Sequence, residues 1–193
     1  KLIMSTKYKA TEISQAYFIT ITTIGWIDVF TRLPQKHLII DALKYCQKNK
    51  GLIVFAYCLM HSHLHLFCRA DRDLKLSEIM RDFKKYTSKK IIQTIQDEPE
   101  SRREWLLEYF SKACEHLSRP QQYKVWQDGY HAEEIFSNHW IKEKIKYIHE
   151  NPVKEKIVTE AENYYFSSAR NYADLDNALD VEVVFMGWDN HKI

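Results

Sequence analysis

The sequence predicts an α+β fold, with a ferredoxin-like (RRM-like) antiparallel sheet, helices on one face of it, a helical insertion and a C-terminal extension. The first observation behind this prediction is the order of hydrophobic patterns, which runs strand, helix, strand, strand, helix, strand. The second is the absence of internal repeats or an obvious linker in 193 residues that include only four Gly and four Pro. We therefore expect one domain over residues 1–193, with a core at about 16–158 and an irregular extension at 159–193. The uncovered face of such a sheet would suit single-stranded nucleic acid.

The first two predicted elements are a strand and a helix. Residues Tyr17–Ile24 are rich in aromatic and β-branched side chains, which favours a strand. The segment Gln35–Lys50 has apolar residues at helical spacing. It follows Pro34 and stops before Gly51, as helices commonly do.

The central region predicts a strand pair and a second helix. Residues Leu52–Arg69 carry scarcely a charge and are too long for one strand, so we expect two strands joined by a tight turn at Met60–Ser62. Residues Leu74–Gln96 show an amphipathic helical pattern that Pro99 ends.

The remaining elements are shorter or less regular. Residues Glu100–Leu117 have a helical pattern, and Tyr123–Trp126 and Ala132–Phe136 favour short strands. A helix is then expected from a cap at 137–139 to Glu150, with Asn151-Pro152 stopping it.

The composition limits the class of protein. Lys and Arg number 28 against 26 Asp and Glu, so a surface for nucleic acid must come from local clustering. No stretch approaches the roughly 18 apolar residues of a membrane span, and residues 1–10 are too polar for a secretory signal. The four cysteines form no C-x-x-C pair, which is typical of buried thiols in a reducing compartment. We therefore expect a cytoplasmic protein of the bacterial cytosol or nucleoid, with no membrane partner.

Three histidines alternate along the second strand of the predicted pair. In a strand, His61, His63 and His65 would project from one face while Leu64 and Leu66 point into the core. Imidazoles side by side on a rigid element can hold a divalent metal ion. The alternative is a half-polar strand whose histidines only make hydrogen bonds.

The predicted helix 74–96 carries a tyrosine among lysines. Cations within one turn of Tyr86 could contact phosphates: Lys84, Lys85, Lys89 and Lys90. The alternative is that Tyr86 packs beside Phe83 with its hydroxyl in water, and that the lysines form an ordinary solvated helix face.

Two phrases of the chain resemble those of a known family. Residues Ala56–Phe67 are similar to A-Y-x-L-M-P-N-H-V-H-L-L, and Phe83–Thr87 to F-K-x-Y-T. Both are typical of REP-associated tyrosine transposases, within the single-tyrosine HUH (IS200-like) transposases, which the chain resembles over about 17–172. The resemblance implies that His63 and His65 are the metal-binding pair, that His61 replaces a family proline, and that Tyr86 is the nucleophile.

Three later phrases agree with this resemblance. They are Val125–Tyr130 (like W-Q-x-G), Tyr147–Lys154 (like Y-I-x-x-N-P-V-x) and Phe166–Tyr172 (like S-S-x-x-x-Y). We interpret Tyr147–Lys154 as a fold-defining helix end with its proline stop.

The third metal ligand departs from the family pattern. Relatives often supply Gln, Asn or His about a turn after the tyrosine, where this chain has Lys90, which cannot bind a metal while protonated, and later Gln93. Gln93 is the candidate; water, DNA or another residue could complete the site instead.

The resemblance implies cleavage of single-stranded or hairpin DNA with Mg²⁺ or Mn²⁺, through a 5′-phosphotyrosine intermediate. It leaves open whether the protein acts as a monomer or a homodimer. Two other hypotheses remain. One is a non-catalytic protein that binds DNA or RNA hairpins, and the other is a zinc hydrolase that uses the three histidines.

Overall fold

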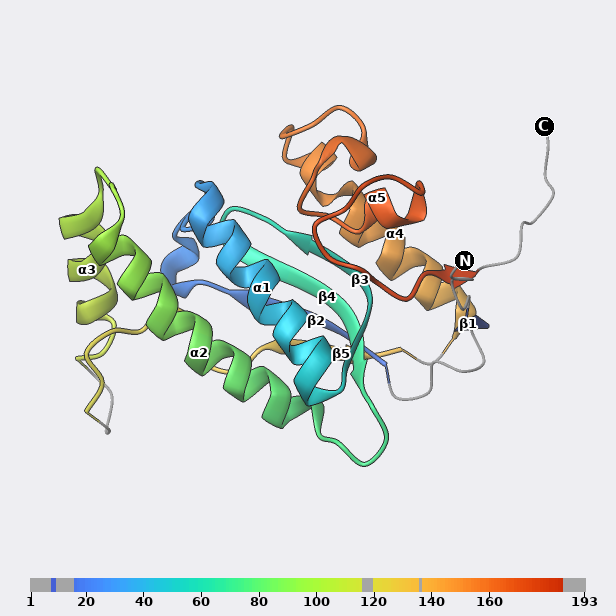
Figure 1. The fold of residues 1–193 in the computed structure, drawn as a ribbon, viewed down its shortest axis with the longest axis horizontal. Helices are drawn as coiled ribbons and strands as arrows, with labels where there is room; N and C mark the ends of the chain where they lie inside the picture. Colours follow the sequence, from blue (N-terminus) through green and yellow to red (C-terminus); the bar gives the residue numbers. More distant parts are fainter. Residues whose placement is uncertain (1–7, 10–15, 116–119, 136, 186–193) are drawn as a thin grey trace.

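Four strands form the central sheet. In this computed structural model, which describes residues 8–9, 16–115, 120–135 and 137–185, the strands are β2 (Tyr17–Thr22), β3 (Leu52–Leu59), β4 (His63–Ala70) and β5 (His131–Glu134). Their order is β3-β4-β2-β5, and every neighbouring pair is antiparallel. This order confirms the predicted ferredoxin-like sheet (Figure 1).

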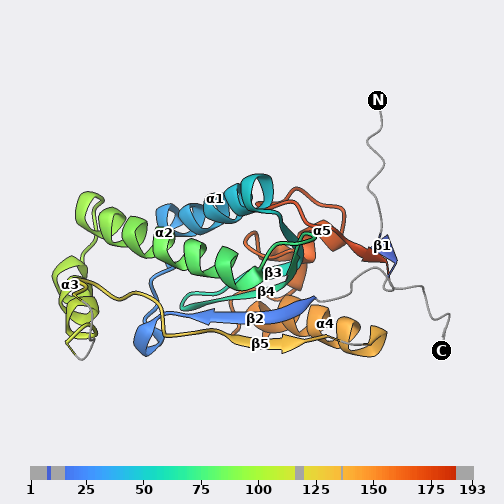
Figure 2. The same ribbon diagram turned by 90° about the horizontal axis from the view of Figure 1, so that it is seen from below.

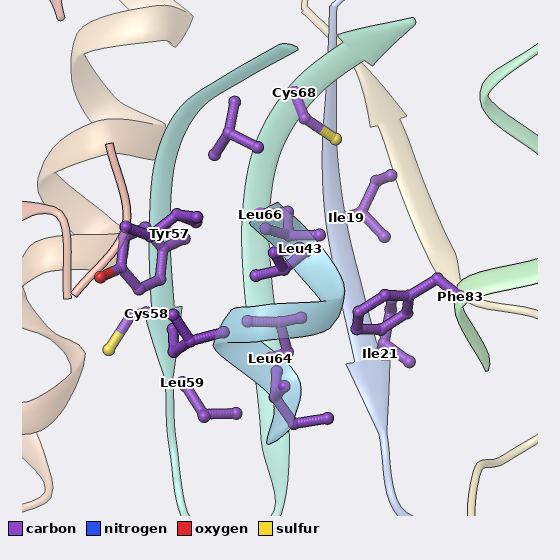
Figure 3. Close-up of a cluster of buried hydrophobic side chains, with 14 of the residues drawn as sticks. Ile19, Ile21, Leu43, Tyr57, Cys58, Leu59, Leu64, Leu66, Cys68 and Phe83 are labelled. Carbon is purple, nitrogen blue, oxygen red and sulfur yellow. The ribbon is translucent and has the colours of Figure 1, made fainter. Parts of the chain in front are cut away.

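Two helices cover one face of the sheet. They are α1 (Leu33–Lys50) and α2 (Leu76–Asp97), which also pack against each other (Figure 2). The end of α1 is fixed at Gly51, whose φ of 65° is the left-handed conformation that glycine adopts without strain. Between helices and sheet lies an apolar core that Figure 3 shows in part: Ile19, Ile21, Leu43, Leu64, Leu66 and Phe83.

The second face of the sheet, which the sequence predicts to be open, is covered by a third helix. Helix α4 (Asn138–Lys154) lies on the side of the sheet opposite to α1 and α2 (Figure 2) and contacts β3 and β4. It buries Ile141, Ile145 and Ile148, so its apolar stripe needs the sheet as a partner. The expected stop at Asn151-Pro152 is also wrong. Pro152 removes one donor, but the backbone N–H of Glu155 still bonds to the carbonyl of Asn151.

The insertion between α2 and β5 contains one helix and a loop. Helix α3 (Arg103–Lys112) is shorter than expected. The predicted strand at 123–126 is a loop with a single bridge between Thr23 and Trp126. A 3-10 turn, η2 (Ile24–Trp26), follows β2 beside this loop.

The C-terminal extension covers the free edge of β3. It comprises η3 (Ala161–Asn163), α5 (Ala169–Tyr172) and β6 (Val184–Phe185), and β6 pairs with β1 (Tyr8–Lys9). Backbone hydrogen bonds of 2.9 Å join Leu59 N–H to the Phe166 carbonyl and Ser168 N–H to the Tyr57 carbonyl. A sheet edge that would otherwise attract other strands is thereby occupied.

No helix within the described ranges is long and apolar enough to cross a membrane.

Candidate active site

His63 and His65 lie side by side on the face of the sheet that α4 covers. Their ring centroids are 4.7 Å apart, and Leu64 and Leu66 point to the opposite face, as the period of two predicts. His61 does not continue this row. It belongs to the turn before β4, and its carbonyl accepts a hydrogen bond from Phe30 N–H.

Each of the two imidazoles is held through its Nδ1 atom. The Oγ1 atom of Thr20 lies 2.9 Å from Nδ1 of His65, and the Oγ atom of Ser62 lies 3.1 Å from Nδ1 of His63. The Nε2 atom of His65 is buried and has no partner among the described residues. Burial lowers the pKa of His65 to about 3 and also lowers that of His63, so both imidazoles stay neutral. A neutral ring with a free Nε2 and a bonded Nδ1 is the usual state of a metal ligand.

Tyr147 of α4 lies directly beside this pair. Its ring centroid is 5.3 Å from that of His65, with the two planes at 72°, and 5.7 Å from that of Phe18. The side chain is 42% exposed, and the ammonium of Lys154 lies 5.3 Å from the ring centroid. Tyr147 therefore combines a rigidly packed ring with access to solvent.

Tyr147 and the histidines line one cavity of about 730 Å³. The lining residues come from β2, η2, β4, the start of β5 with the loop before it, and α4 with the residue after it: Thr20, Thr22, Trp26, His63, His65, Gln127, Asp128, Gly129, Tyr130, His131, Tyr147, Asn151 and Glu155.

Asn151 follows Tyr147 by one helical turn and faces the same way. It is 8% exposed, and its Nδ2 atom donates to the Tyr147 carbonyl at 3.2 Å, which leaves its amide oxygen for another partner. Within the described part of the chain, no three His, Cys, Asp or Glu side chains are grouped so that they could hold a metal ion. The zinc site of three histidines is therefore not formed. Two imidazole nitrogens and an amide oxygen nevertheless offer three donors for a divalent metal ion, and the oxygen is the donor type that Mg²⁺ and Mn²⁺ prefer.

Contacts with the C-terminal extension fix α4 in place. The Nε2 atom of His149 lies 2.9 Å from the Oγ atom of Ser168, which accepts a 2.8 Å hydrogen bond from Tyr57 N–H. Burial lowers the pKa of His149 to about 4. A neutral histidine thus links the helix that carries Tyr147 to strand β3.

Tyr86 is not brought to the histidines of its own chain. It is 54% exposed on α2, where it lines a groove against α1 with Asp41 and Tyr45. The sheet lies between α2 and α4 (Figure 2), and it is α4 that helps to line the histidine cavity. Gln93 is also on α2, where its Oε1 atom accepts a 3.0 Å hydrogen bond from Lys90. The set of Tyr86, Gln93 and the two histidines is therefore not assembled within one chain.

The family phrase at Phe83–Thr87, which lies on α2, is explained by structural contacts. The ammonium of Lys84 donates to the Gln127 carbonyl at 2.7 Å and also to the Gly129 carbonyl. Thr87 accepts a 3.0 Å hydrogen bond from the Trp126 indole N–H. Residues 83–87 thus hold the 126–130 loop, which lines the histidine cavity. The ammonium of Lys84 is already bonded to this loop.

The other three lysines border a separate groove. This groove of about 730 Å³ lies along α2 and residues 121–123. Lys85, Lys89 and Lys90 line it, together with Tyr86, Gln93 and Gln96.

Sequence reasoning missed Tyr147 and Asn151 as site residues. The available signal was their spacing, because a tyrosine and an amide at i and i+4 share one face of a helix. They were missed because the segment was interpreted as a helix end with its proline stop.

The chain is similar to transposases in sequence and in fold. The family model for IS200-like transposases matches residues 3–124, a segment that contains His63, His65 and Tyr86 and ends before α4. A solved REP-associated tyrosine transposase bound to a REP hairpin has a TM-score of 0.58 at 17% identity, with 93% of each chain covered. A putative transposase from Deinococcus radiodurans has a TM-score of 0.42 at 17% identity, with 69% of this chain and 87% of that chain covered. No curated protein matches the sequence. Because the family model covers well over half of the chain, the protein belongs to the IS200-like transposase family.

Proposed function

We propose that the protein is a single-stranded DNA endonuclease and strand transferase in which Tyr147, not Tyr86, is the nucleophile. The observation that carries this proposal is the position of Tyr147, whose ring lies beside a buried His65 with a free Nε2 atom. His63, His65 and the amide oxygen of Asn151 would hold Mg²⁺ or Mn²⁺.

The reaction is a transesterification. When bound, the cation would draw electron density from a non-bridging phosphate oxygen and offset the developing negative charge. The Tyr147 oxygen bonds to phosphorus and the bond from phosphorus to the 3′ oxygen breaks. The phenolic proton passes to water, and the 3′ oxygen takes a proton from water. The products are a 5′-phosphotyrosine and a free 3′-OH, and the retained phosphoester allows the strand to be rejoined.

Hairpin DNA is the proposed substrate. The similar REP-associated transposase is bound to a REP hairpin, which supports a related ligand here. Lys85, Lys89 and Lys90 are the proposed phosphate contacts, because they border one groove and, unlike Lys84, do not bond to the described part of the loop before β5.

The position of Tyr86 leaves one catalytic route for it, which is attack on a phosphate held by the histidines of a second copy. That route requires a homodimer. Catalysis by Tyr147 needs only one chain, since Tyr147 and His65 are in contact within it.

A covalent adduct assay distinguishes the two tyrosines. Hairpin DNA with a labelled single-stranded flank is incubated with Mn²⁺, and the adduct is detected on a denaturing gel. We expect adduct from the wild type and from Tyr86→Phe, and none from Tyr147→Phe. Each substitution removes only a hydroxyl group from a substantially exposed ring. Adduct from Tyr147→Phe would overturn the assignment.

Two further results of the adduct assay would point to a different mechanism or function. Adduct restored by mixing Tyr147→Phe with His65→Gln would show that two chains share a site, and we expect no restoration. Hairpin binding by the wild type with no adduct in Mg²⁺ or Mn²⁺ would identify a non-catalytic binding protein instead.

A further inference from the structure

Trp26 is a large aromatic side chain at the wall of the histidine cavity, and burial does not explain its presence. It is 60% exposed, and its ring centroid lies 5.4 Å from that of His63, with the planes at 72°. Single exposed aromatic residues are common on protein surfaces, but this indole lines a cavity beside His63, where its free face can meet a ligand.

The backbone at Trp26 is unusual as well. Gly25 and Trp26 are both left-handed, with φ of 59° and 57°. Glycine adopts this conformation freely, whereas a bulky residue is strained in it. The strain is maintained by the surroundings, which fix where the indole lies.

The turn that carries Trp26 is held on several sides. The hydroxyl oxygen of Thr23 lies 2.7 Å from the Ile27 carbonyl and 2.9 Å from the Ser62 carbonyl, and its single proton serves these two acceptors. The N–H of Ile24 donates to the Val125 carbonyl at 2.7 Å. The turn is therefore tied to the residue before β4 and to the loop before β5, and the cavity is lined by other residues of that strand and loop.

Helix α3 supports the same turn from outside. A Cβ atom added to Gly25 would lie 2.0 Å from the Tyr109 hydroxyl oxygen, so α3 is packed against the turn at this point. The segment before α3 is anchored by the ion pair of Arg102 and Asp28 at 2.6 Å. The indole of Trp26 is thus presented on a preorganised turn, which lowers the entropic cost of binding a flat ligand.

We infer that Trp26 is a stacking platform for an unpaired base of the DNA strand, next to the phosphate that the proposed reaction cleaves. Every base has an aromatic face, so stacking recognises an unpaired strand with little dependence on sequence. A base in a duplex is already stacked and cannot use the platform. The contact therefore favours the single-stranded flank over the hairpin stem. This inference rests on the proposed function for the identity of the ligand as DNA.

The test measures binding without cleavage. The probe is a hairpin oligonucleotide with a single-stranded flank that contains 2-aminopurine, titrated with protein in EDTA. We expect the wild type to quench the 2-aminopurine fluorescence. We expect Trp26→Ala to weaken binding about 10-fold or more and to abolish most of the quenching. Trp26→Phe should lie between them.

Three controls separate stacking from other effects. A blunt hairpin without the flank should bind wild type and Trp26→Ala equally. Trp140→Ala removes a comparably exposed indole (54%) that does not line the cavity, and it should bind the flanked probe as the wild type does. Trp26→Gly removes the ring and also the strain of the positive φ, so it should weaken binding without lowering the melting temperature.

The stacking role of Trp26 would be refuted if Trp26→Ala bound the flanked probe as tightly as the wild type does. It would also be refuted if the substitution weakened binding to the blunt hairpin by the same factor. The adduct assay is independent of this result. If Tyr147→Phe forms an adduct while Trp26→Ala loses flank binding, the proposed nucleophile fails and the platform stands. If the adduct behaves as expected and Trp26→Ala binds normally, only the platform fails.

Discussion

The Oγ1 atom of Thr20 lies 2.9 Å from Nδ1 of His65, so strand β2 orients a histidine that belongs to β4. Such contacts set the tautomer of a metal ligand, and their loss typically weakens metal affinity by about 10- to 100-fold. We expect Thr20→Val to lower Mn²⁺ affinity by that amount, measured by isothermal titration calorimetry. Thr22→Val is the matched control, because Thr22 lies opposite His63, whose Nδ1 is held by Ser62 instead. Equal affinities of the two variants would contradict the orienting role of Thr20.

The hydrogen bond between Thr87 and Trp126 predicts a loss of stability. Thr87→Val keeps the shape of the side chain but leaves the buried Trp126 indole N–H without an acceptor, which costs about 1–3 kcal/mol. Urea denaturation measures the change. Thr94→Val is the control, since the hydroxyls of Thr87 and Thr94 each donate to the carbonyl four residues earlier, but only that of Thr87 accepts a bond from an indole. A similar loss in both variants would show that the helix, rather than the loop contact, is responsible.

The buried state of His149 predicts a pH-dependent stability. Its folded pKa of about 4 lies below the unfolded value of 6.5, so acid protonates the unfolded chain first. The stabilising contribution is complete above pH 6.5 and is lost as the pH falls through 4, by up to about 3 kcal/mol. His149→Gln should therefore lose less stability than the wild type between pH 7 and pH 4, by thermal unfolding at each pH. His139→Gln, an exposed substitution in the first turn of the same helix, controls for removal of an imidazole. Identical acid curves for wild type and His149→Gln would refute the assignment.

The groove beside α2 predicts a salt-dependent contact with DNA. If Lys85 and Lys89 each neutralise one phosphate of duplex stem, the double variant Lys85→Gln/Lys89→Gln should reduce the slope of log K against log salt by about 1.8. Fluorescence anisotropy at several salt concentrations measures this slope. Lys44→Gln/Lys48→Gln on α1 removes the same charge from exposed positions outside the groove and should leave the slope unchanged. An unchanged slope in the α2 variant would remove these lysines from the DNA interface.

The sheet and the histidine pair could be predicted from the sequence because both depend on a local period. Alternation along residues 63–70 places His63 and His65 on one face whatever packs above them. The two ends of helix α1 could likewise be predicted from Pro34 and Gly51, because the backbone preferences of these residues act locally. The sheet order followed from the succession of elements, since few topologies suit that order.

Local sequence patterns could not show which of the two tyrosines lies beside the histidines. Tyr86 and Tyr147 both adjoin an apolar stripe on an amphipathic helix, and a stripe says which side of a helix is buried but not which face of the sheet receives it. Only the long-range packing places α2 on the leucine face of β4 and α4 on its histidine face. The sequence by itself determined the sheet and the side on which His63 and His65 project. The tertiary structure alone brought Tyr147 and Asn151 to them, because that proximity depends on contacts between residues some eighty positions apart.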